Sequence, residues 1–176
     1  MGYLKHIKLG ILLLLVHVIW GYGQEQIPWN PDLKLTWANF KGAVPHGAEA
    51  AATTASGISY DFSTYYEGRE MKVKFNVYTY FYPTRSWYRP KVCNEVTLKH
   101  EQLHFDITEL YARKLKTRLR NTKFGTDIKQ EVRKIYKATL RQLNDFQNKY
   151  DAETNYSRNL PVQERWIGEI KAALQQ

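Results

Sequence analysis

The sequence predicts an α+β protein, in which a small N-terminal antiparallel sheet precedes a mostly helical part. Residues 53–62 and 71–82 are rich in β-branched and aromatic side chains, as strands are. Residues 94–119, 126–150 and 163–174 instead place apolar side chains near helical spacing. Strands that come first and helices that follow are typical of α+β proteins.

A secretory signal peptide is predicted at residues 1–23. Lys5 and Lys8 precede an apolar run at 11–20, and small residues then lead to a cleavage site near Gly23. The run is too short for a membrane span, and no transmembrane segment is expected after cleavage. We therefore expect residues 24–176 to form a single domain that is secreted or periplasmic.

The 176-residue chain has a net charge of +9, which becomes 9 − 2 = +7 without the two lysines of the signal peptide. Basic residues are densest at 113–120, where a helix would present them as a solvated face. An anionic envelope surface is a candidate partner for this face, whereas no nucleic-acid-binding motif accompanies it and no nucleic acid partner is expected.

The single Cys93 allows no intramolecular disulfide, and a structural thiol is favoured over a soft metal ligand.

The N-terminal elements are predicted from alternation and turn residues. Leu33–Trp37 alternates like a short strand, and the irregular segment 42–52 should form a loop with a solvated His46. In the strand at 71–82, one face should pack on the helices: Met71, Val73, Phe75, Val77, Thr79 and Phe81. The other face contains a row of tyrosines, which suits either a substrate groove or cross-strand aromatic pairing: Tyr78, Tyr80 and Tyr82.

The helix at 94–119 contains the motif His-Glu-x-x-His at His100, Glu101 and His104. The two histidines lie one turn apart on the same face, so their ring nitrogens can bind one Zn²⁺. Glu101 lies about 100° round the helix. From there its carboxylate can act as the general base that activates water, without being a ligand. The spacing therefore predicts a zincin-like metal site.

A third protein ligand is needed, because catalytic zinc usually takes three. On the motif helix, Asp106 and Glu109 lie about 140° and about 160° from the histidine midline, which makes them poor candidates. The polar turn expected at 150–156, between the second and third helices, is the more suitable donor. There Asp151 or Glu153 could ligate the metal, or could serve as capping and turn residues.

The motif extends to His-Glu-Gln-x-His-Phe-Asp-Ile at residues 100–107, which is far more specific than the short form. Together with residues 35–42, 51–60, 100–109 and 150–155, and with Gln163 and Trp166, this chain resembles a bacterial family of predicted secreted zinc-dependent proteases. The resemblance implies a histidine after Asn155 as the third zinc ligand. This chain has Tyr156 there, so a tyrosine oxygen or the nearby Asp151 would have to complete the site.

Two functions are expected from these features. The first is a secreted zinc metallopeptidase that acts on a peptide or protein substrate, with Glu101 as catalytic base and His100, His104 and Tyr156 or Asp151 as metal ligands. The alternative is a non-catalytic envelope or secreted protein that keeps the fold with an incomplete metal site and binds a partner through its basic, tyrosine-rich surface.

Overall fold

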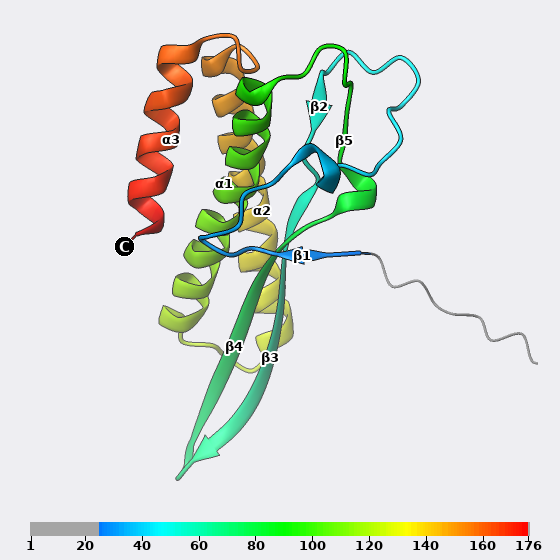
Figure 1. Cartoon of the computed structure of the whole chain (residues 1–176). Coiled ribbons are helices and arrows are strands. Elements are labelled where there is room, and N and C mark those ends of the chain that lie inside the picture. The colour runs from blue at the N-terminus through cyan, green and yellow to red at the C-terminus, as the bar shows by residue number, and fades with distance from the viewer. Residues whose placement is uncertain (1–24, 176) are drawn as a thin grey trace, which may run out of the picture.

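The computed structural model describes residues 25–175, which form antiparallel sheets followed by three helices (Figure 1). The α+β prediction is therefore confirmed. The strands are β1 (Ile27–Pro28), β2 (Ala52–Thr53), β3 (Ser56–Glu67), β4 (Glu70–Phe81) and β5 (Trp87–Tyr88). The helices are α1 (Glu95–Asn121), α2 (Ile128–Thr154) and α3 (Leu160–Leu174). The predicted signal peptide lies outside the described residues.

The long hairpin of β3 and β4 is the main sheet element. Its register runs without interruption from Ser56 opposite Phe81 to Glu67 opposite Glu70, and Gly68 supplies the positive φ of 63° in the turn. Strand β1 pairs with β4, and β2 pairs with β5 in a separate two-stranded sheet. The prediction for the 71–82 strand is confirmed over its second half, where Phe75, Val77 and Phe81 pack in the hydrophobic clusters.

Helix α1 is the central element, because it contacts β3 and β4 as well as α2 and α3. It begins after Asn94, whose side chain accepts hydrogen bonds from the backbone N–H groups of Val96 and Thr97. Its apolar residues form the main core with the hairpin and the other helices. The most buried members of this core are Ile107, Leu115, Leu119, Val132 and Tyr150.

A smaller cluster of Leu35, Phe40, Phe81 and Phe105 fastens the N-terminal segment to α1. The strand predicted at Leu33–Trp37 is wrong, because Leu35 is buried but its N–H donates to the side chain of Gln102 rather than to a neighbouring strand, and Trp37 begins a short 3-10 helix. Alternation alone cannot distinguish a strand from an extended segment that lies on a helix.

Three other boundaries differ from the prediction. The strand expected at 53–62 is divided into β2 and β3, and β3 continues to Glu67. Helix α2 does not end at Tyr150 but continues to Thr154, so Asp151 is a helical residue rather than a turn residue. Helix α3 begins at Leu160, three residues earlier than expected, with Pro161 in its first turn. Among residues 25–175, no helix is long and apolar enough to cross a membrane.

Candidate metal centre

Three side chains from two helices converge at one point. Oδ1 of Asp151 lies 3.0 Å from Nε2 of His100 and 2.9 Å from Nε2 of His104, and the two Nε2 atoms are 3.3 Å apart. His100 and His104 share a face of α1, and Asp151 lies in the last turn of α2. Two imidazole nitrogens and one carboxylate oxygen in such proximity form a group that could hold a metal ion.

Gln163 of α3 determines which nitrogen of His100 faces this group. The Gln163 amide donates through Nε2 to the carbonyl oxygen of Val96, which leaves Oε1 facing Nδ1 of His100 at 3.2 Å. Nδ1 must therefore be the donor, and in the neutral ring Nε2 presents its lone pair to Asp151. Two acceptors 3.0 Å apart need a cation or a proton between them.

The charges of the group reinforce one another. Burial raises the pKa of Asp151, but its hydrogen bonds with His100 and His104 outweigh burial and hold that pKa below its usual value. Burial lowers the pKa of His104, but the hydrogen bond to Asp151 and the negative charges of Glu101 and Asp151 raise it overall. A proton therefore occupies the metal-free group readily, and a metal ion would have to replace it.

The neighbouring Tyr150 holds the two histidines in place. Its ring stacks on His100 with centroids 4.4 Å apart and meets His104 edge-on at 5.1 Å. Burial, followed by the nearby carboxylates, raises the pKa of Tyr150 far above its usual value. The phenol is therefore neutral. Tyr150 packs against the two histidine rings and does not serve as an anionic ligand.

Glu101 has an oxygen atom that no protein group satisfies. The residue is only 5% exposed, and its Oε2 is buried without a hydrogen-bond partner among the described residues. An unsatisfied buried carboxylate oxygen costs free energy, so this atom is available to bond with a group that enters the site. Glu101 lines the same cavity as the convergent group.

The cavity has a volume of about 610 Å³ and opens between α1 and the segment 49–54, which contains β2. Tyr156, Ser157 and Arg158 also line it. Tyr156 has 63% of its surface exposed, and its N–H donates to the carbonyl oxygen of Asp151. The structure thus brings His100, Glu101, His104 and Asp151 together and places Tyr156 at the mouth of the same cavity.

The other sequence candidates lie outside the convergent group. Glu153 is a helical residue of α2 that accepts hydrogen bonds from the side chains of Arg165 and Trp166 of α3, so it is neither part of the convergent group nor a turn residue. Cys93 is half-buried and donates to the carbonyl oxygen of Ala51, and burial raises its pKa. His46 is exposed, as predicted. The tyrosine row does not line the cavity, and Tyr78 stacks instead on Tyr80.

Two contributors were missed as functional residues by sequence reasoning. Gln163 lies in the apolar stripe of α3 yet is polar and 1% exposed, and this mismatch could have signalled a buried partner. Gln147 of α2 lines the cavity and donates to the carbonyl oxygen of His104, but nothing distinguishes it in sequence from any other helical glutamine.

The site therefore defines the class of this molecule: an α+β protein with a cavity whose floor could hold a metal ion. The chain belongs to the DUF922 family, described as bacterial protein of unknown function, which its residues 38–158 match. The matched region contains the His100–His104–Asp151 group and ends before α3. No curated protein and no solved structure matches the chain.

Proposed function

We propose that this protein is a secreted or periplasmic zinc-dependent metallopeptidase. The observation that supports the proposal most directly is the buried Oε2 atom of Glu101, which has no protein partner and lies beside the convergent His100, His104 and Asp151. Nitrogen and oxygen donors in this combination suit Zn²⁺, with a position left for water or substrate. Asp151 is preferred to Tyr156 as third ligand, because only the Asp151 oxygen is within 3.0 Å of both histidine nitrogens.

A zinc ion held there would supply a Lewis acid that polarises a carbonyl group and makes water more acidic. Glu101 accepts a proton at Oε2 from the attacking water as the new C–O bond forms. Glu101 then gives that proton to the amide nitrogen as the C–N bond breaks, so protons and electrons balance. Gln163 keeps Nε2 of His100 directed at the site throughout, through its hydrogen bond to Nδ1.

Within residues 25–175, β2 pairs with β5 alone, and its other edge supports a peptide as the substrate. In the antiparallel pair of β2 and β5, the Arg89 N–H bonds to the carbonyl of Ala51, which makes Ala51 and Thr53 the residues bonded to β5. The N–H and C=O of Ala52 therefore point to the opposite edge. Strand β2 also contacts α1, and the segment 49–54 lines the cavity. An extended peptide can add to such an edge as another strand.

The decisive test is Glu101→Gln. This variant should lose hydrolysis by a factor of about 10² to 10⁴, the usual contribution of a general base, while zinc measured by elemental analysis stays at the wild-type level. A chelator should remove the wild-type activity, and added zinc should restore it. Chelator-sensitive hydrolysis that persists in Glu101→Gln would contradict the proposed role of this residue.

The alternative of a non-catalytic binding protein is motivated by Tyr156, which stands where the resemblance implies histidine. It predicts that no peptide substrate is hydrolysed in a zinc-dependent way, even when zinc is bound in full. Profiling the zinc-loaded protein against a peptide library distinguishes the two functions. The metallopeptidase is favoured because Asp151 offers a third donor without Tyr156.

A further inference from the structure

The positive charge of this protein is concentrated in one segment. Residues 113–141 contain eleven basic and two acidic residues, a net charge of +9. The other residues of 25–176 contain thirteen basic and fifteen acidic ones, a net charge of −2. A solvated helix surface normally mixes the two signs, so this separation requires an explanation beyond solubility.

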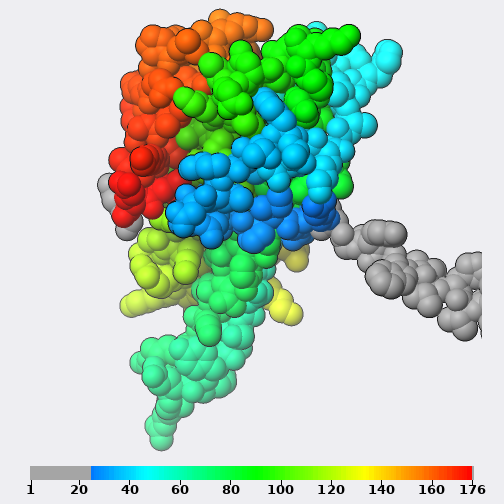
Figure 2. Space-filling model, in the orientation of Figure 1, coloured from blue at the N-terminus to red at the C-terminus, as the bar shows by residue number. Residues whose placement is uncertain are grey.

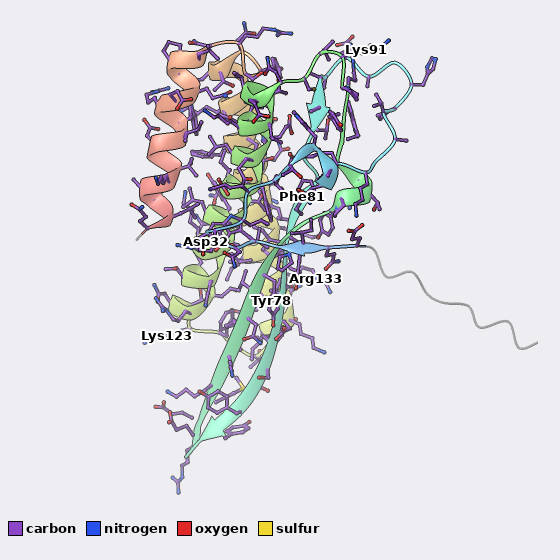
Figure 3. The ribbon with its side chains drawn as sticks, viewed as in Figure 1. Asp32, Tyr78, Phe81, Lys91, Lys123 and Arg133 are labelled. Carbon is purple, nitrogen blue, oxygen red and sulfur yellow. The ribbon has the colours of Figure 1, made fainter. Side chains whose placement is uncertain are left out.

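The segment forms one end of the helical layer: the C-terminal third of α1, the connection, and the N-terminal half of α2. Figure 3 labels Lys123 and Arg133 there, whereas Lys91 lies at the other end of the molecule. Ten of the eleven basic side chains are exposed, and none of the ten has an ion-pair partner within residues 25–175: Lys114, Lys116, Arg118, Arg120, Lys123, Lys129, Arg133, Lys134, Lys137 and Arg141.

The β3–β4 hairpin projects past the same end, as Figures 1 and 2 show. Phe75 packs against Phe124 of the α1–α2 connection, and farther out on that face the cross-strand pairs become more exposed. The outermost is Tyr66 opposite Met71, with exposed fractions of 74% and 42%. Residues 64–73 thus present exposed Tyr65, Tyr66 and Met71 beside the basic segment, next to a charged turn at 67–70.

We propose that this end of the protein binds the surface of an anionic lipid bilayer. The membrane-binding end comprises the basic segment 113–141 and the hairpin tip 64–73. Lysine and arginine side chains near a bilayer are attracted by anionic headgroups. Tyrosine prefers the interface between headgroups and hydrocarbon, because its ring is apolar and its hydroxyl polar. A projecting tip of this kind can enter the interface while the basic helices remain at the headgroups.

A bilayer accounts for both features together better than other anionic partners do. A nucleic acid or an acidic protein would use the basic segment, but would give no role to the uncovered Tyr66–Met71 pair. The arrangement also keeps the cavity away from the bilayer. On α1 the basic segment begins at Arg113, nine positions or about 14 Å along the helix from His104, and the helix ends at Asn121, 17 positions or about 26 Å from His104. The membrane-binding end would therefore tether the protein and leave the metal centre open to solution.

The test is vesicle flotation of the chain that begins at Gln24, since residues 25–175 contain every strand, helix and hydrophobic cluster described above. Vesicles of phosphatidylcholine are compared with vesicles that contain about one-third phosphatidylglycerol, at low salt and at several times that ionic strength. The protein should float with the anionic vesicles only, and high salt should reduce the bound fraction.

Two variants and two matched controls locate the binding surface. Reversing Lys116, Arg120 and Lys123 to glutamate should weaken vesicle binding by at least about tenfold. The control reverses three exposed lysines outside the membrane-binding end, Lys34, Lys91 and Lys171, and should weaken it much less although its net charge is the same.

The double variant Tyr66→Thr and Met71→Thr should weaken vesicle binding several-fold. The vesicle binding that remains should be more sensitive to salt than that of the wild type. Its control replaces Val44 and Val92, two other exposed apolar residues with exposed fractions of 42% and 52%, and should bind as the wild type does. Circular dichroism checks that each variant is folded.

Three results would overturn the proposal: binding to both vesicle types alike, equal losses in the variants and their controls, or binding to DNA or an acidic polymer without binding to anionic vesicles. None of these assays depends on zinc or on hydrolysis, so their outcome is independent of the proposed peptidase activity.

Discussion

Nε2 of His104 lies 2.9 Å from Oδ1 of Asp151, although the two residues belong to different helices. The contact joins the motif helix α1 to the last turn of α2. It brings the Asp151 carboxylate oxygen to the two histidines as a third possible metal ligand, which the motif itself does not contain. It depends on the packing of α1 against α2, which buries Leu115, Leu119 and Val132 in the shared core.

Asp151→Ala should lower zinc affinity by more than the roughly 10- to 100-fold that loss of an outer-shell partner costs, because it removes a convergent oxygen. Competition with a chromogenic chelator measures the change. Glu153→Ala is the matched control: it removes a carboxylate two residues away that binds Arg165 and Trp166, and it should leave zinc affinity near the wild-type value. Equal losses in both variants would contradict the assignment of Asp151.

Gln163→Met should lower zinc affinity roughly 10- to 100-fold, because His100 loses the hydrogen bond that orients its ring. Gln163→Glu is the conservative comparison, since a carboxylate can still accept from Nδ1 of His100, and it should retain more affinity. The variant with methionine also leaves the Val96 carbonyl without its side-chain donor, so its folding is checked by circular dichroism. Affinity that is unchanged in folded Gln163→Met would show that His100 needs no such orientation.

Tyr156→Phe should retain the zinc content of the wild type, because the phenol lies at the exposed mouth of the cavity and Asp151 supplies the third donor. Elemental analysis of the purified variant gives the answer. Loss of zinc would identify the tyrosine oxygen as a ligand. Tyr156→His extends the test: a rise in zinc affinity in that variant alone would mean that a histidine there adds a donor.

Asp106→Asn should stabilise the metal-free protein at neutral pH. Burial raises the pKa of Asp106, and the hydrogen bonds from Trp29 and Gln102 lower it only in part. Because the folded protein holds this proton more tightly than the unfolded chain, Asp106 makes the protein less stable as pH rises from its unfolded pKa through its folded pKa. Asparagine keeps an Oδ1 acceptor and does not titrate.

Thermal denaturation in the presence of a chelator tests this loss of stability at pH 4 and at pH 7. The first pH is close to the reference pKa of about 3.9 for aspartate, and the second is well above it. The melting temperature of Asp106→Asn relative to wild type should be higher at pH 7 than at pH 4. A difference of the opposite sign would mean that the charged carboxylate is stabilised by its surroundings.

Leu115→Ala should lower the free energy of unfolding by about 2–5 kcal/mol, because the side chain is fully buried in the main core and its loss leaves a cavity. Met71→Ala, at the exposed hairpin tip, should change it by less than about 0.5 kcal/mol. Chemical denaturation measures both. A large effect of Met71→Ala would mean that the tip is part of the cooperative core rather than a free surface.

Local patterns were sufficient for much of the fold. The helix around His100, the amphipathic pattern of α2 and the inward face of β4 at Phe75, Val77 and Phe81 all depend on spacing along one element. The prediction was wrong at Leu33–Trp37, where alternation reflects contact with α1 instead of strand pairing. It was also wrong at the end of α2, since no helix-breaking residue occurs before Asn155 to mark it.

The sequence by itself determined the chemistry that the site can have: two histidines one helical turn apart with a glutamate beside the first. Helical geometry brings these residues onto adjoining faces whatever surrounds them. Only the tertiary structure decided which residues complete the site. Asp151 and Gln163 lie on other helices, 51 and 63 positions from His100. Their approach depends on how three helices pack together, and no periodicity within a single element encodes that arrangement.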